Sequence, residues 1–76
     1  MIICQVRANV LVVEPDDSKA ERTLASLKLV YAGEFVRVQT VEEALSLLGQ
    51  AHKFNIVAFD GSVWSVEQAI AIWQVN

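Results

Sequence analysis

The sequence predicts a small α/β domain of three layers, in which helices lie on both sides of a short parallel sheet. Three observations lead to this prediction. Three apolar runs recur along the 76 residues, an amphipathic segment follows each run, and each such segment starts with Ser or Thr followed three positions later by Glu or Gln. Strands that alternate with helices form parallel sheets through right-handed crossovers. The predicted order is β-α-β-α-β-α within one domain, residues 1–76.

The first strand is predicted at residues 8–14. It contains four consecutive apolar residues, beginning at Val10, and three of them are β-branched. Such a run is typical of a strand that is covered on both faces. Pro15 ends it. Residues 1–6 either lengthen this strand or add an antiparallel edge strand that turns at residues 7–9.

A helix is expected to follow, with Ser18 and Glu21 as its capping box. Its apolar face is formed by residues at helical spacing, namely Leu24, Leu27 and Tyr31. Its solvated side carries cations, namely Lys19, Arg22 and Lys28. Gly33 offers the permissive backbone at which such a helix can end.

The second strand is predicted at residues 34–39, where an alternating pattern indicates an edge strand. Thr40 and Glu43 form the next capping box, and Gly49 ends that helix. The third strand is predicted at residues 54–59 and ends on Asp60-Gly61. Ser65 and Gln68 then cap a helix that continues to the end of the sequence.

Composition excludes several classes of protein. Hydrophobic residues make up 54% and charged residues 20%, which excludes a disordered tail. The six basic residues are scattered and the net charge is -3, so no nucleic-acid partner is expected. No apolar run is long enough to span a membrane, and the first residues lack the pattern of a secretory signal. Cys4 is the single cysteine, so no internal disulfide can form, and a cytoplasmic location is expected.

Three segments of the sequence resemble the receiver domains of response regulators. Residues 10–16 resemble the first strand of that family with its acidic end, and residues 38–48 resemble its second strand and helix. Residues 54–60 resemble its third strand, which ends on the phospho-accepting aspartate. The resemblance covers residues 8–73 and implies the first half of a flavodoxin-like fold, with its three strands in the order 2-1-3.

The resemblance also implies a phosphoryl-transfer site, in which Asp60 matches the acceptor and Glu14 matches an acid that holds Mg²⁺. The second metal-binding acid of the family falls on Pro15, so Asp16 or Asp17 would have to replace it. Trp64 stands where receivers usually carry a proline. The hydroxyl residue and lysine of the family's later strands have no counterpart here. We therefore expect no catalysis, no cofactor and no metal site.

Simpler structural roles account for the same residues. Asp60 can form a turn with Gly61, and Glu14, Asp16 and Asp17 are favourable beside the start of a helix. His52 is the single histidine, in a polar connection, and is expected to be solvated. Ser18, Thr40 and Ser65 are expected to be helix caps. No glycine-rich nucleotide-binding pattern is present.

A three-stranded sheet in this order leaves the third strand at an edge, where its unpaired amides and carbonyls would promote association. We expect a second copy or another protein to cover it. The residues expected at that interface are Ile56, Val57, Phe59, Trp64 and Trp73. The sequence thus predicts a non-catalytic regulatory module that binds a larger regulator or forms a homodimer. The alternative is a phosphoacceptor that uses Asp60, with Mg²⁺ held by Glu14, Asp16 and Asp60.

Overall fold

A computed structural model describes residues 5–50 and 53–74. The expectations for Cys4 and His52, and part of that for residues 1–6, lie outside the described residues. None of the described helices is both long and apolar enough to cross a membrane.

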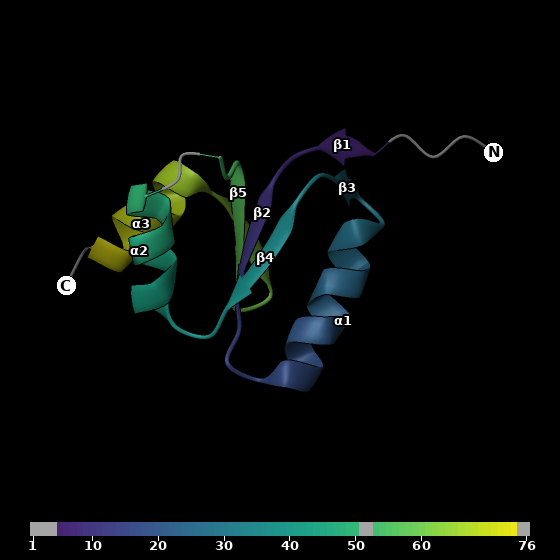
Figure 1. The fold of residues 1–76 in the computed structure, drawn as a ribbon, viewed down its shortest axis with the longest axis horizontal. Coiled ribbons are helices and arrows are strands. Elements are labelled where there is room, and N and C mark those ends of the chain that lie inside the picture. The colour runs from purple at the N-terminus through teal and green to yellow at the C-terminus, as the bar shows by residue number, and fades with distance from the viewer. Residues whose placement is uncertain (1–4, 51–52, 75–76) are drawn as a thin grey trace.

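The main sheet has four strands in the order β4-β2-β5-β6 (Figure 1). The central strand β2 (Val10–Val13) pairs in parallel with β4 (Phe35–Val38) on one side and with β5 (Ile56–Phe59) on the other. The order predicted for the three parallel strands and the edge position of the second are therefore confirmed. The fourth strand, β6 (Ser62–Ser65), was not predicted and runs antiparallel to β5.

The strand β6 corrects the expectation of an open β5 edge. Asp60 and Gly61 form the turn of a β5–β6 hairpin, with φ of 51° and 76°. Two-residue hairpin turns of type I′ require positive φ at both positions, and Asp-Gly is a preferred pair there. The chain therefore covers its own third strand, with Val57 opposite Trp64. The turn expected at Asp60-Gly61 is therefore present, but the alternating residues that follow it form a strand that the sequence did not predict.

Three helices cover the two faces of the sheet unequally. On one face, α2 (Val41–Gln50) packs against β2 and β4, and α3 (Val66–Gln74) packs against β5 and β6. On the other face, α1 (Asp17–Lys28) packs against β2. Figure 1 shows α2 and α3 together on one side of the sheet and α1 on the other. The three-layer α/β architecture is thus confirmed.

Two of the predicted helix caps are present. The Glu43 amide donates to Thr40 Oγ1 at 3.2 Å at the start of α2, and the Gln68 amide donates to Ser65 Oγ at 3.2 Å at the start of α3. The Gln68 side chain also accepts from the Ser65 amide at 3.3 Å, which completes a capping box. Both helices therefore begin where the sequence predicts.

The first helix begins and ends earlier than predicted. Its N-cap is Asp16, whose Oδ1 accepts from the Lys19 amide at 2.9 Å, so the proposed cap at Ser18 is wrong. Its last residue is Lys28, and Tyr31 lies in a short strand, β3 (Tyr31–Ala32), that continues into β4. The helical spacing of Tyr31 was therefore coincidental.

A second, two-stranded parallel sheet extends the first one. The strand β1 (Val6–Arg7), which precedes β2, pairs with β3, which precedes β4. In the described part of this segment, the expectation of a longer first strand or an antiparallel edge strand is therefore wrong, because Val6 and Arg7 form a separate strand in a parallel pair. Gly33 does not end a helix but lies where these two chain segments meet. A Cβ atom at Gly33 would lie 2.1 Å from the Ala8 carbonyl oxygen, so a residue with a side chain would force the segments apart.

Asn9 joins three segments of the chain just before β2. Its Oδ1 accepts from the Glu34 amide at 3.0 Å, and its Nδ2 donates to the Lys53 carbonyl at 2.9 Å. The Asn9 amide in turn donates to Asn55 Oδ1 at 2.8 Å. These bonds fix where β2, β4 and β5 begin relative to one another, and therefore also where their carboxyl ends lie.

The core consists of two clusters, one on each side of the sheet. The cluster beneath α2 and α3 is the larger, and its buried members include Leu11, Ala44 and Val57, each with no exposed surface. The cluster beneath α1 contains the buried residues Val10, Val12, Leu27 and Ala58. Successive residues of β2 thus contribute alternately to the two clusters, as the pleat of a strand requires.

Candidate functional site

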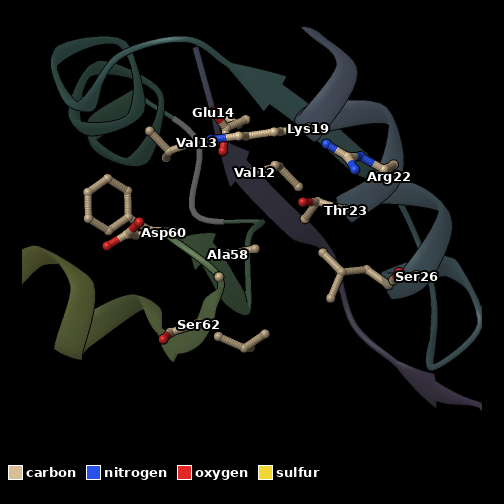
Figure 2. Close-up of a pocket in the computed structure, with 14 residues that line it drawn as sticks. Val12, Val13, Glu14, Lys19, Arg22, Thr23, Ser26, Ala58, Asp60 and Ser62 are labelled. Carbon is tan, nitrogen blue, oxygen red and sulfur yellow. The ribbon is translucent and has the colours of Figure 1, made fainter. Parts of the chain in front are cut away.

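A groove of about 570 Å³ runs between α1 and the β5–β6 hairpin (Figure 2). We call it the α1–hairpin groove. The wall on α1 is formed by Lys19, Arg22, Thr23 and Ser26, and the wall on the hairpin by Ala58, Asp60, Ser62 and Val63. Val12 lies between the two walls, and Glu14 lies at the end of the groove. The groove therefore reaches the carboxyl ends of β2 and β5.

The unequal covering of the sheet produces this groove. On this face α1 packs against β2 and β3, and its Leu27 shares a buried cluster with Ala58 of β5, whereas no described helix packs on β6. Ala58 and Val63 are cross-strand partners, so their side chains share a face. Ala58 is buried, but Val63 on the outer strand is 46% exposed. An apolar side chain is thus left partly open to solvent at the hairpin wall.

The α1 wall is a polar stripe along one side of the helix. Lys19, Arg22, Thr23 and Ser26 follow one another at intervals of three, one and three residues, which places them on one helical face. Lys19 and Arg22 are exposed, and Figure 2 shows all four on the α1 side of the groove. The sequence predicts a solvated surface for the two cations, and the spacing of Thr23 and Ser26 is the signal that places these hydroxyl residues on the same side of the helix.

The acids of the candidate phosphoryl-transfer site are only partly brought together. Glu14 and Asp60 line the same groove. Asp16 is engaged as the cap of α1, and the hydrogen bond from the Lys19 amide lowers its pKa below the ordinary value of 3.8. Within residues 5–50 and 53–74, no group of three or more His, Cys, Asp or Glu side chains is placed to hold a metal ion. The set Glu14, Asp16 and Asp60 is therefore not gathered into a metal site.

Asp17 pairs with Arg37, a residue to which the sequence assigned no role. Arg37 on β4 contacts Asp17 Oδ1 at 2.8 Å and donates from Nε to the Glu14 carbonyl at 2.9 Å. Arg37 thus ties the carboxyl end of β2 to the start of α1. Because its carboxylate already pairs with Arg37, Asp17 is poorly placed to replace the missing metal ligand.

The residues expected at an interface have different surroundings. Val57 has no exposed surface and cannot contact a partner, so that expectation is wrong. Phe59 and Trp73 make an edge-to-face contact with centroids 5.5 Å apart, and both pack against the core on the α2–α3 face. Trp64 packs against the same core. Ile56 is half-buried and packs on the α1 face.

Comparisons with protein families, with curated proteins and with solved structures find no match for this chain.

Proposed function

We propose that this chain is a non-catalytic regulatory module of the cytoplasm that binds another protein through the α1–hairpin groove. The observation that carries the proposal is the sheet face that α1 covers only in part, with Val63 exposed on it. The proposal keeps the class of function expected from the sequence but moves the binding surface. The edge of β5, which was the expected surface, is paired with β6.

The exposed residues of the groove suit a protein partner. Protein interfaces combine an apolar centre with a polar rim. Val63 provides apolar surface, and Lys19, Arg22, Thr23, Asp60 and Ser62 contribute charges and hydroxyls to the same groove. A homodimer was expected in order to cover the β5 edge. Because β6 covers that edge, the structure gives no reason to prefer a second copy over a different protein.

Site-specific crosslinking tests this proposal. A photo-reactive amino acid is placed at position 63 in the groove, and at position 42 of α2 as the control. Both wild-type residues are exposed, but Glu42 lies on a helix of the opposite face. Irradiation in the cell that makes the protein should give a discrete crosslinked protein from position 63 and none from position 42. Equal labelling from both positions, or none from either, would refute the proposal.

The second candidate is a phosphoacceptor at Asp60, favoured by the presence of Glu14 and Asp60 in one groove. Three features weaken it: Asp60 belongs to a tight hairpin turn, Asp16 is a helix cap, and Asp17 pairs with Arg37. Incubation with acetyl phosphate and Mg²⁺ separates the two candidates. We expect no phosphate uptake, whereas labelling that disappears in Asp60→Asn would establish the phosphoacceptor.

A further inference from the structure

We propose that the α1–hairpin groove binds an acidic amphipathic helix of the partner protein. This inference rests on the proposed function and specifies the chemistry of the partner. Three properties of the groove lead to it: the lack of a described helix over β6 on this face of the sheet, the exposed apolar side chain of Val63, and the cations along the α1 wall.

The shape of the site fits a helix that lies beside α1. A helix is about 10 Å in diameter and covers about two strands spaced about 4.8 Å apart. On the opposite face two helices share the four strands, whereas here α1 packs against β2, reaches Ala58 of β5 through Leu27, and leaves β6 without a described helix. The two strands of the hairpin have four residues each, so each is about 13 Å long. About nine helical residues have the same length.

The apolar part of the site matches a bound helix whose apolar residues form one narrow row. Val63 is 46% exposed and Ile56 is half-buried on the same face of the hairpin, with Ala58 between them at the base. A helix with apolar residues at positions i, i+4 and i+7 would place their side chains in one row over these strands.

The charges of the α1 wall select an acidic helix. The ion pairs among the described residues join Arg37 to Asp17 and Lys53 to Glu34, and neither includes Lys19 or Arg22. These two cations are three residues apart and exposed on the groove side of α1. Glutamates on the adjoining flank of a bound helix would pair with both. Asp60 on the hairpin wall favours a basic residue on the other flank.

A second copy of this chain does not offer such a helix. The apolar sides of α1, α2 and α3 are already packed on the sheet. The large apolar residues exposed in the described part of the chain are Val6, Leu29, Val30, Val63 and Ile72. Of these, Ile72 lies within a helix, and a single side chain does not make an apolar seam. The helix therefore belongs to a different protein.

Titration with synthetic peptides tests the inference. The first probe is a 14-residue alanine-based helix with three leucines at i, i+4 and i+7 and glutamates along one flank. The second is identical but has lysines in place of the glutamates. The third has the acidic composition with a central proline that breaks the helix. Amide shifts of the ¹⁵N-labelled full chain are recorded against each peptide.

We expect the acidic helix to shift signals of α1 and the hairpin and to bind about threefold to tenfold more tightly than the basic helix at low salt. Two exposed ion pairs support a preference of this size, and salt should reduce it. The proline peptide should not bind. Weak shifts spread over both faces, or no shift at millimolar concentration, would overturn the inference.

Charge reversal supplies the matched control. The double variant Lys19→Glu/Arg22→Glu should prefer the basic peptide. The variant Arg7→Glu/Lys28→Glu changes the net charge equally at exposed positions that do not line the groove, and should keep the acidic preference. The same preference in both double variants would refute the role of the α1 wall.

Two further outcomes separate this inference from the proposed function. If position 63 crosslinks to a protein but no acidic helix binds, the module binds its partner in another way and the inference alone fails. If inorganic phosphate shifts the signals of Lys19, Arg22 and Thr23 while no peptide binds, the groove is a site for a small anion, and the inference is overturned.

Discussion

The two faces of the sheet differ in how completely the chain covers them. Beneath α2 and α3, buried residues from β2 and β5 and aromatic side chains near the carboxyl terminus form one continuous cluster. On the opposite face, α1 buries a smaller cluster over β2 and leaves Val63 of the hairpin partly exposed. The comparison indicates that one face supplies most of the folding free energy. The other face keeps part of its apolar surface exposed.

The largest effect expected is at the centre of the covered face. Leu11 has no exposed surface there. Leu11→Ala should lower the free energy of unfolding by about 2–5 kcal/mol, because it removes buried contacts and leaves a cavity. Urea denaturation followed by tryptophan fluorescence measures the loss. A loss below about 1 kcal/mol would show that this face is not the main core.

A matched pair of valines compares the two faces directly. Val57 and Val63 lie on adjacent strands of the hairpin, but Val57 is fully buried on the covered face and Val63 is 46% exposed on the other. Val57→Ala should cost about 2 kcal/mol. Val63→Ala should cost less than about 1 kcal/mol. Similar losses in the two variants would contradict the difference between the faces.

A matched pair of glycines tests whether the hairpin turn holds β6 in its pairing with β5. Gly61 has φ of 76° in the turn, so Gly61→Ala should cost about 1 kcal/mol through backbone strain. Gly49 lies in α2 with open space around it, so Gly49→Ala should be neutral or stabilise by up to about 1 kcal/mol. If both substitutions changed the stability in the same direction, the result would argue against a stabilising role of the turn. Thermal unfolding provides the measurement.

The smallest effects expected are those of pH. The Lys19 amide lowers the pKa of Asp16, and the Lys53 side chain lowers the pKa of Glu34, from ordinary values of 3.8 and 4.5. Because both pKa values are lower in the folded state, these groups stabilise the fold fully above their ordinary values. That stabilisation is lost as the pH falls below them. Melting temperatures measured from pH 6 to pH 2 should therefore decline below about pH 4.5.

Two variants assign that decline to the two acids. Glu34→Gln removes the ion pair with Lys53 and should make the decline shallower. Asp16→Asn can still accept the Lys19 amide, so it should keep α1 capped while it removes the titrating group. An unchanged pH profile in both variants would assign the acid sensitivity to other carboxylates.

Much of the architecture was predictable because local patterns specify it. The apolar run from Val10 required a strand buried on both faces, and the capping boxes at Thr40 and Ser65 set the starts of α2 and α3. The local patterns did not specify the structure where the same residues are compatible with two different elements. Tyr31 fits a helical face and a strand equally well, and Asp60-Gly61 fits both the end of a strand and a hairpin turn.

The sequence by itself determined the alternation of strands and helices, the parallel pairing around β2, and the small, acidic character of the domain. These follow from periodicity and capping, which act within a few residues. Only the tertiary structure decided that β6 pairs with β5, that Arg37 pairs with Asp17, and that α1 packs over β2 and leaves Val63 of β6 partly exposed. Each of these depends on contacts between residues distant in the chain, and no local pattern encodes how helices are distributed over a sheet.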